Sequence, residues 1–413
     1  MKSNKDMIEI LNKSDCCGCS ACAQKCPKKC ITMESDNEGF KYPVVDETVC
    51  VNCNLCLKVC PILNKTANTD SLLECYLIQN NNDKERYNSA SGGFFSPLAV
   101  YFVKNNGVVF GSSFNSEMEL EHSYSDNVKN VYKFSGSKYV QSDIRKTYIE
   151  VSDFLKDGRK VLFSGTPCQI EGLYAFLGNK DTSNLVTLDF ICHGVPSPGL
   201  FKKYKEFMEK TFGSQMINYA SRNKKLGYST SDSFWALCGF KDKVNITADK
   251  DHPYVNFMNK AFFAEICSRP SCFKCLFKGK NHKSDFTVYD CWDVDKLQQD
   301  MDDNKGTTVL IVNTEKAKNV LNEISHFYKI RPISFNKLLK FDTASMFYSM
   351  IPNVNRGAFF QDMQYLSIPQ LYDKYLDFEP AQPSFLKRMF KNVLKYMGLL
   401  LLARRIKYTW RRS

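Results

Sequence analysis

The sequence predicts a protein of the α+β class, with a small cysteine-rich domain at the N-terminus and a larger domain of mixed strands and helices behind it. Two groups of cysteines occupy residues 16–60, and strand and helix patterns alternate from about residue 73 to residue 313. The chain has 413 residues, enough for two or three domains that each bury a core. Polar segments in residues 66–84 separate the two parts, and we expect a linker there.

Two stretches in the N-terminal part share one cysteine spacing. Residues 15–27 read DCCGCSACAQKCP and residues 49–61 read VCVNCNLCLKVCP, so each contains C-x2-C-x2-C-x3-C followed by proline. In such a quartet, three thiolates on a tight loop hold three corners of one 4Fe-4S cluster and the fourth ligates the other cluster. A zinc site would need two pairs of ligands instead. The spacing therefore predicts two clusters, the first held by Cys16, Cys19, Cys22 and Cys60, and the second by Cys50, Cys53, Cys56 and Cys26.

Cys17 and Cys30 fall outside the quartets, and local packing explains them better than metal ligation. Between the quartets, residues 39–46 read GFKYPVVD and alternate like a short strand, as expected for the hairpin of a two-cluster ferredoxin. We therefore interpret residues 1–65 as a ferredoxin-type domain. Such a domain carries electrons and does no bond chemistry alone.

The composition favours a cytoplasmic globular protein. The N-terminus, MKSNKDMIEILNKSD, is too polar for a signal peptide. Eighteen cysteines in an unsecreted chain favour metal ligation over disulfides, because cytosolic thiol pools keep cysteines reduced. The net charge is +12, but nine Lys and Arg residues lie after residue 384, where there is no acidic residue. The rest of the chain is nearly neutral, which argues against nucleic-acid binding.

The larger part alternates between strand and helix patterns, which is the rhythm of an α/β layer protein. We expect strands at residues 73–79, 108–114, 159–165, 185–194, 284–293 and 306–314, and helices at residues 91–107, 148–158 and 168–178. The sheet is expected to end near Asn313.

Four loops beside these elements are rich in small polar residues: SASGGFF, SGSKYVQSD, FSGTPCQ and ICHGVPSP. Such junctions can present backbone N–H groups and a helix N-terminus to a pyrophosphate or a flavin. Each loop taken alone is more simply explained as an ordinary turn. The sequence has no G-x-G-x-x-G motif, so an ordinary dinucleotide-binding site has no support.

Six motifs follow one another along the chain: NSASGGFFSPLA, GSKYVQSDI, VLFSGTPCQIEGLYAFL, DFICHGVPSP, RPSCFKCLFKGKNHKSDFTVYDCWD and KGTTVLIVNT. In this order, from about Ser89 to Asn313, they resemble the beta subunit of coenzyme F420-reducing hydrogenase and its relatives. The resemblance implies a ferredoxin domain followed by a mixed α/β flavin-binding domain that binds FAD. It divides the chain after the linker into residues 85–160 and 161–345 of that domain, a connecting segment at 346–383 and a tail at 384–413.

The resemblance also implies where the flavin is bound. The expected contacts are Ser91, Gly92, Gly93, Ser137, Lys138, Tyr139, Gln141, Thr166, Gln169, His193, Gly194 and Asp285. Several have competing explanations. His193 either serves the flavin or relays a proton, as the one candidate catalytic residue, or it caps a turn. Lys138 either neutralises a phosphate or a reduced flavin, or is a solvated loop lysine. Asp285 either holds a ribose or caps a turn, and Arg222 and Lys225 either bind an anionic substrate or lie on an exposed face.

Residues 267–275 read CSRPSCFKC, and this C-x4-C-x2-C spacing is one that iron–sulfur proteins complete with a distant cysteine. We expect a third 4Fe-4S cluster with these ligands: Cys168, Cys267, Cys272 and Cys275. Cys192 and Cys291 are the other candidates for the distant ligand, and zinc binding or plain burial of the three thiols are the alternatives. Cys75 and Cys238 lie in apolar strands and are expected in the core.

The function that follows is an iron–sulfur flavin-dependent oxidoreductase, which passes electrons from a ferredoxin or another redox partner through the clusters to FAD and an organic substrate. The alternatives are a non-catalytic electron-transfer subunit of a larger complex and an F420-dependent oxidoreductase. Some relatives are similar to proteins encoded beside exopolysaccharide genes, so a role in polysaccharide biosynthesis is a further expectation.

The tail, residues 384–413, has apolar residues at helical spacing with lysines and arginines between them. It is too short to span a bilayer. A basic amphipathic helix suits peripheral contact with the inner face of an anionic membrane, where a lipid-linked substrate would lie. Docking of the tail on the protein's own core is the alternative.

Overall fold

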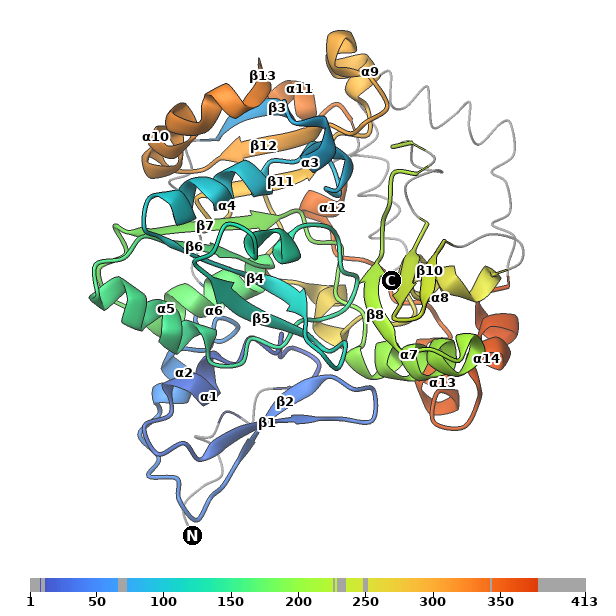
Figure 1. The fold of residues 1–413 in the computed structure, drawn as a ribbon. Helices are drawn as coiled ribbons and strands as arrows, with labels where there is room; N and C mark the ends of the chain where they lie inside the picture. Colours follow the sequence, from blue (N-terminus) through green and yellow to red (C-terminus); the bar gives the residue numbers. More distant parts are fainter. Residues whose placement is uncertain are drawn as a thin grey trace.

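The computed structural model describes residues 8, 12–65, 73–225, 227–228, 235–247, 252–341 and 344–377. The basic tail at 384–413 lies outside the described residues. Figure 1 shows the ferredoxin-type domain at one end of a large sheet and a second lobe beside that sheet. Among the described residues, no helix is both long and apolar enough to cross a membrane.

The N-terminal domain contains two short helices and one hairpin: α1 (Ala21–Lys25), β1 (Ile31–Ser35), β2 (Lys41–Val45) and α2 (Leu55–Lys58). β1 and β2 are antiparallel, with Ile31 opposite Val45. Asp36 closes the turn, because one carboxylate oxygen accepts bonds from the backbone N–H groups of Glu38 and Phe40, both at 3.0 Å. The expected hairpin is present, with each cysteine quartet beside one of the helices.

An eight-stranded mixed sheet forms the body of the molecule, in the order β13-β3-β12-β11-β7-β6-β4-β5. Its strands are β3 (Glu74–Asn80), β4 (Val108–Phe114), β5 (Leu120–Ser125), β6 (Val161–Ser164), β7 (Leu185–Phe190), β11 (Phe286–Asp290), β12 (Thr308–Val312) and β13 (Tyr328–Ile333). β4, β6, β7 and β11 are parallel, so their carboxyl ends share one edge. The sheet continues beyond Asn313 to β13, and the expected linker at 66–84 ends before Glu74 because β3 pairs with both β12 and β13.

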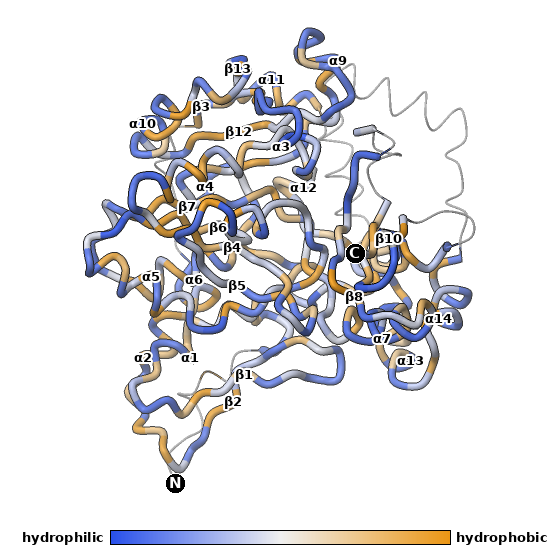
Figure 2. Tube along the Cα trace, in the orientation of Figure 1, coloured by the Kyte–Doolittle hydropathy of each residue, from blue (hydrophilic) through white to orange (hydrophobic). Residues whose placement is uncertain are grey.

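Helices cover both faces of this sheet. Alternate residues of the strands point to opposite sides, so that Val109 and Leu162 face one apolar cluster while Val108 and Phe163 face another. The first cluster is covered by α4 (Phe95–Lys104) and α10 (Glu315–Ile324), and the second by α5 (Thr147–Lys156), α6 (Pro167–Leu177) and α1. Figure 2 shows hydrophobic residues along the central strands and hydrophilic residues on the outer loops.

A second lobe contains a three-stranded sheet with helices around it. Its elements are α7 (Pro198–Phe212), β8 (Met216–Ala220), β9 (Leu237–Phe240), β10 (Lys243–Thr247), α8 (Phe257–Phe263), α13 (Arg356–Asp362) and α14 (Ile368–Tyr375). Its apolar cluster includes Phe40 and Tyr42 of the ferredoxin-type hairpin. The remaining helices are α3 (Asp83–Tyr87), α9 (Val294–Leu297), α11 (Phe335–Leu338) and α12 (Ala344–Phe347), and the short 3-10 helices are Val131–Phe134, Pro253–Asn256, Pro270–Lys274, Gln299–Met301 and Ser325–Phe327.

One buried arginine joins the N-terminal domain to the rest of the chain. Arg269 is 1% exposed, and its guanidinium donates to the backbone carbonyls of Cys16 (2.7 Å) and Lys41 (3.0 Å). It also donates to the side-chain oxygen of Gln141 at 3.0 Å and lies 4.2 Å from the centre of the Tyr42 ring. Gly18 allows this approach, because a Cβ there would lie 2.8 Å from the guanidinium.

Arg269→Ala should lower the free energy of unfolding by about 3 kcal/mol or more, because it leaves buried carbonyls without a charged donor. Chemical denaturation of the anaerobic full-length chain measures this. Arg145→Ala is the matched control, since the Arg145 side chain is 48% exposed and its ion pairs should contribute no more than about 1 kcal/mol. Equal losses for the two variants would contradict this role of Arg269.

Candidate metal and cofactor sites

The first cysteine quartet is assembled at the domain contact. Cys16 and Cys19 lie on the loop that leads into α1, where Gly18 and Ser20 have positive φ angles of 70° and 61°, and Cys22 lies in the first turn of that helix. Cys60 reaches the same place from the end of the second quartet. Burial, together with the neighbouring Cys16 and Cys60 thiols, raises the pKa of Cys22 to about 12. Cys60 is thus close to Cys16 and Cys22, as crossed ligation requires.

The second quartet lines a small cavity of its own. Cys26, Cys50, Cys53 and Cys56 surround it together with Cys30. Cys53 is exposed, whereas Cys30 is buried and its Sγ lies 3.4 Å from the Sγ of Cys26. The structure therefore brings both predicted quartets together and places the extra cysteine, Cys30, in direct contact with one of them.

No three His, Cys, Asp or Glu side chains in the described ranges lie close enough to hold one metal ion. A 4Fe-4S cluster is a different case, because each of its four irons takes its own thiolate and the four sulfurs surround the cluster instead of converging on one atom. The two N-terminal donor sets, four cysteines around each place, fit such a group.

A third group of cysteines lines a cavity of about 310 Å³ between the two domains. The five that line it come from four places in the chain: Cys17, Cys168, Cys192, Cys272 and Cys275. Burial and the nearby Cys168 and Cys275 thiols raise the pKa of Cys272 to about 12. Burial raises the pKa of Cys192 well above its usual value, and Cys272 is the strongest of the thiols that add to this shift. Two of the three candidates for the distant ligand, Cys168 and Cys192, therefore reach the Cys272–Cys275 pair.

The expected ligand set of the third cluster has to be corrected at Cys267, because the structure does not place this residue at the cavity. It is 0% exposed and packs with Phe257, Ile266 and Phe359 in the apolar cluster of the second lobe, outside the cavity. Pro270 starts a 3-10 helix just after it, so Cys272 and Cys275 turn toward the cavity while Cys267 stays behind. Cys291, the third candidate for the distant ligand, also lies elsewhere, in an apolar cluster with Cys75.

Basic side chains surround the same cavity. Among the residues that the structure describes, Arg269, Lys274 and Lys278 line it, against a single carboxylate, that of Asp15. Lys278 donates to the carbonyls of Cys192 and Ser345, both at 2.6 Å, which fixes the loop after β7. Cluster-bound thiolates carry negative charge, so these cations favour them over buried neutral thiols.

Two histidines lie on the cavity wall. Burial alone would lower the pKa of His282, but the Asp189 carboxylate, 2.7 Å from its Nδ1, raises it overall. His193 is held by a 2.6 Å contact between its Nε2 and the Glu265 carboxylate, and it packs against Phe262. The candidate catalytic residue His193, with Gly194 beside it, therefore faces the cysteine cavity.

The loop at Ser91–Gly93 lies at the carboxyl edge of the sheet, beside the start of β12. The N–H of Gly92 donates to the Thr308 hydroxyl at 2.8 Å, and the hydroxyl of Ser91 donates to the carbonyl of Thr307 at 2.9 Å. Gly93 has a φ of 84°, which favours glycine. The loop is thus fixed by its own contacts to β12.

The segment Ser137–Gln141 has two separate roles. The ammonium group of Lys138 donates to the carbonyls of Ser135 (2.9 Å) and Phe134 (3.3 Å), and burial lowers its pKa to about 8. Tyr139 packs on Phe262, with ring centres 4.8 Å apart. Gln141 instead donates to the carbonyl of Cys17 at 3.0 Å and so belongs to the domain contact.

Of the remaining expected contacts, two support α6 and one lies far from the others. The Thr166 N–H donates to the Gln169 side chain at 2.9 Å, and Gln169 donates to Ser142, so both are used at the start of α6. Asp285 precedes β11 and is therefore at the opposite edge of the sheet, where its carboxylate accepts bonds from Thr187 at 2.8 Å and Thr314 at 2.7 Å. The structure does not bring Asp285 to the other candidates.

Sequence reasoning missed a buried polar network at the carboxyl edge. Tyr228 donates to Asp290 at 2.6 Å and stacks on Trp292, with ring centres 4.9 Å apart. Arg222, a candidate for anion binding, instead donates to the other oxygen of Asp290 at 2.6 Å. Burial, with repulsion from nearby arginines, lowers the pKa of Lys224 to about 7. Only the basic run SRNKK gave a signal for this network.

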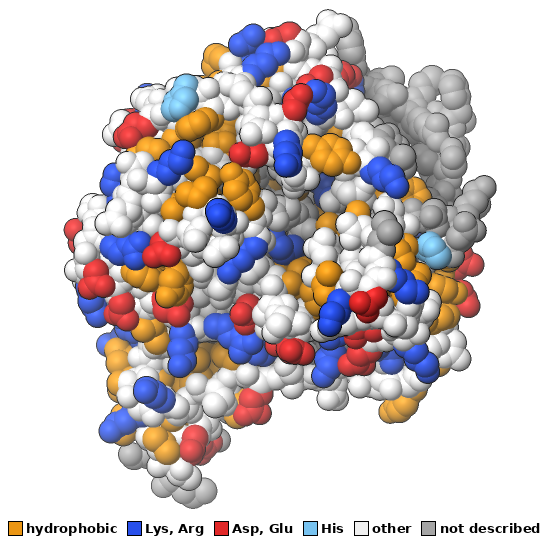
Figure 3. Space-filling view, in the orientation of Figure 1, with side chains coloured by type: hydrophobic (Ala, Val, Ile, Leu, Met, Phe, Trp, Pro, Cys, Tyr) orange, Lys and Arg blue, Asp and Glu red, His pale blue; other side chains and the backbone are white. Residues whose placement is uncertain are grey.

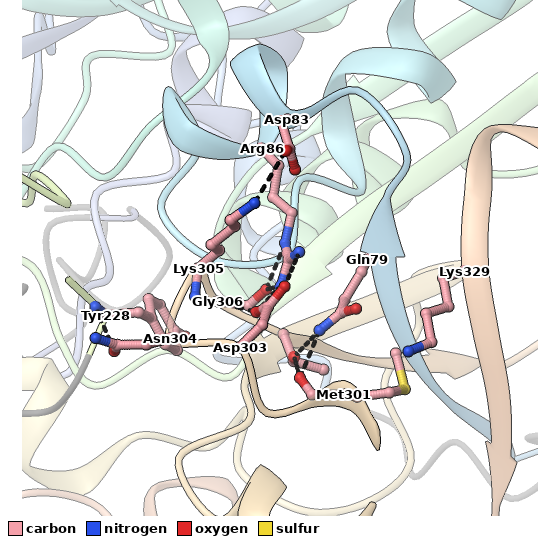
Figure 4. Close-up of polar contacts among 12 residues, drawn as sticks. Gln79, Asp83, Arg86, Tyr228, Met301, Asp303, Asn304, Lys305, Gly306 and Lys329 are labelled. Atoms are coloured by element: carbon pink, nitrogen blue, oxygen red, sulfur yellow. Dashed lines mark hydrogen bonds and ion pairs between the residues drawn. The ribbon is translucent and has the colours of Figure 1, made fainter. Parts of the chain in front are cut away.

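The loop that precedes β12 contacts this polar network at Tyr228. Arg86 forms a two-pronged ion pair with Asp303, both bonds at 2.7 Å, and donates to the carbonyl of Gly306 at 2.8 Å. Asn304 accepts a bond from the N–H of Tyr228 at 2.9 Å. Figure 4 shows these contacts joining the loop to β3 and α3 on one side and to Tyr228 on the other. Figure 3 shows a recess between the large sheet and the second lobe, with lysine and arginine side chains around it.

Comparison with known proteins agrees with this arrangement. Residues 158–334 match the family described as the C terminus of the coenzyme F420 hydrogenase/dehydrogenase beta subunit. Residues 15–63 match the 4Fe-4S dicluster domain, so the resemblance and the ferredoxin-type domain inferred from the motifs are both confirmed. The beta-subunit domain therefore follows an iron–sulfur domain, and the chain is an iron–sulfur redox protein.

Among proteins with curated descriptions, none matches this chain. A solved structure of the F420-reducing NiFe hydrogenase complex from Methanosarcina barkeri, derivatised with xenon, contains a chain that is similar to it. The two are 12% identical, with a TM-score of 0.43, over 67% of this chain and 89% of that one.

Crossed ligation can be tested with single cysteine changes. Cys60→Ser and Cys22→Ser should each remove about four irons and leave the same reduced-state EPR spectrum, because both serve the first cluster. Cys26→Ser should leave the other spectrum, and Cys75→Ser, a buried cysteine in β3, should lose no iron. If Cys60→Ser resembles Cys56→Ser instead of Cys22→Ser, the ligation is not crossed.

Proposed function

We propose that this protein is a flavin-dependent iron–sulfur oxidoreductase with a third 4Fe-4S centre between its two domains. The observation that carries the proposal is the cavity of about 310 Å³, which cysteines from both domains line. Its ligands would be Cys168, Cys192, Cys272 and Cys275, with Cys17 as a neighbouring thiol. When bound, the clusters supply one-electron transfer, and a flavin couples single electrons to the reduction of an organic substrate.

The donor set and its surroundings support a cluster there. Buried neutral thiols gain little from basic neighbours, whereas thiolates on a cluster gain from each of them. Arg269, Lys274 and Lys278 are all on the wall of the cavity. Lys278 donates to the backbone carbonyl of Cys192, and the backbone N–H of Cys275 donates to the Ser349 hydroxyl at 2.9 Å. These hydrogen bonds fix the backbone positions of Cys192 and Cys275 without help from a bound cluster.

The first cluster site and this cavity share one wall, which supports electron exchange between the domains. Cys17 lines the cavity, and its neighbours Cys16 and Cys19 are expected ligands of the first cluster. Hydrogen bonds among the thiols of Cys17, Cys19 and Cys168, together with the burial of all three, raise the pKa of each on balance. The carbonyl of Cys17 is held by Gln141 and that of Cys16 by Arg269, so the separation of the two sites is fixed by hydrogen bonds.

For the flavin we propose FAD at the carboxyl edge of the sheet, with the segment Ser135–Tyr139 as part of its site. Ligands of open α/β sheets bind outside the carboxyl ends of the strands. Phe190, which ends β7 at this edge, is 43% exposed, and so is Phe263, next to Tyr139. Lys138 supplies a cation for a phosphate or for a reduced flavin, and aromatic rings supply stacking surfaces.

The anaerobically purified chain should contain about twelve irons, four for each of three clusters. Cys192→Ser and Cys275→Ser should each leave about eight, because a lost ligand releases the third cluster. Cys267→Ser is the matched control and should keep about twelve, since Cys267 faces the apolar cluster of the second lobe. About eight irons in the unmodified chain, or one zinc in place of the missing four, would exclude the third cluster.

Flavin content tests the second part of the proposal. The chain should carry one FAD, Lys138→Met should lower its occupancy without loss of iron, and Lys146→Met, at an exposed lysine, should not. Because the pKa of Lys138 is about 8, affinity for FAD should fall as pH rises above that value and Lys138 loses its charge, and this pH dependence should disappear in Lys138→Met.

A turnover assay with reduced ferredoxin and a panel of oxidised organic substrates then separates the remaining candidates. Turnover by the isolated chain supports an enzyme. Reduction of the clusters without turnover indicates an electron-transfer subunit of a larger complex, and a requirement for a deazaflavin indicates an F420-dependent enzyme.

A further inference from the structure

Cys30 is the one cysteine in the second cluster cavity that the ligand spacing does not use. It lies four residues after Cys26, and Lys29 between them has a φ of 53°, so the chain turns back sharply. This turn brings the Sγ of Cys30 to 3.4 Å from the Sγ of Cys26. Cys30 is 6% exposed and lines the cavity with all four expected ligands.

The backbone of the hairpin fixes the position of Cys30. Its carbonyl accepts a bond from the N–H of Asp46 at 2.8 Å, and the next residue, Ile31, begins β1 opposite Val45. Cys30 and the residue after it are therefore both tied to the end of β2. The contact between the two sulfurs follows from the register of the hairpin and does not depend on a free loop.

We propose that the Cys30 thiol donates an S–H hydrogen bond to the Cys26 ligand sulfur and thereby raises the reduction potential of the second N-terminal cluster. A buried free cysteine in apolar surroundings behaves as a neutral thiol with a weak S–H donor. A ligand thiolate is a strong acceptor, because charge-assisted hydrogen bonds are stronger than neutral ones. Hydrogen bonds to cluster sulfurs are among the factors that set the potential.

The direction of the effect follows from charge. Reduction adds an electron to a cluster whose ligands already carry negative charge, and a donor hydrogen beside one sulfur stabilises the added charge. Removal of that donor disfavours the reduced form. The potential of this cluster should then move to a more negative value, while the iron and its four ligands remain in place.

The test is an EPR-monitored redox titration of the anaerobic full-length chain with Cys30→Ala. One midpoint potential should shift to a more negative value, with the iron content unchanged. Cys30→Ser, which keeps an O–H donor, should recover part of the shift. Cys75→Ala, another buried cysteine but in β3 and away from the clusters, should leave every midpoint potential where it was.

Two results would overturn the proposal. If Cys30→Ala loses about four irons, Cys30 is a cluster ligand and not a donor to one. If the iron is retained and no midpoint potential moves, the contact with Cys26 has no electronic effect. Neither result depends on the third cluster or on FAD, because each is a difference between the Cys30→Ala variant and the unmodified chain.

Discussion

The buried guanidinium of Arg269 is the interaction on which the rest of this structure depends. It donates to backbone carbonyls on the first cluster loop and on the hairpin, and its own backbone N–H donates to the carbonyl of Val195 in the loop after β7. A charge that is 1% exposed needs several acceptors to offset its desolvation. Because those acceptors belong to both domains, neither the ferredoxin-type loop nor the segment before Cys272 can move without leaving Arg269 unsatisfied.

A second set of contacts reinforces this join from the other side of the hairpin. Glu38 forms a two-pronged ion pair with Arg356 of α13, and its carbonyl accepts a bond from the Ser197 hydroxyl. Gly39 lies so close to Gly199 that a Cβ on it would be 2.4 Å from the backbone there. The hairpin thus docks on the first turn of α7, and the ferredoxin-type domain is part of one packed body instead of a tethered carrier.

The sequence predicted the elements whose patterns are local. Both cluster quartets, the hairpin and nearly every strand of the parallel core lie where spacing and periodicity indicated, because thiol spacing and alternation depend only on neighbours in the chain. Features that depend on contacts between residues far apart in the chain could not be predicted in the same way. Nothing local separates Cys267 from Cys272, since which of them faces the cavity depends on the turn at Pro270 and on the apolar cluster beneath. β13 and the role of Arg269 likewise depend on partners more than sixty residues away.

The contrast between the candidate cofactor residues has the same origin. The resemblance predicts that Lys138, Gln141 and Asp285 all contact the flavin, but the structure places them apart. Asp285 is at the amino end of a parallel strand, Gln141 is at the domain contact and Lys138 is beside the carboxyl edge.

Charge distinguishes the cysteine cavity from an ordinary apolar core. Thiols whose pKa is raised by burial must lose protons before they can ligate iron, and the surrounding Arg269, Lys274 and Lys278 favour that loss. At the proposed third cluster, cations that would be a cost beside neutral thiols would stabilise the bound thiolates.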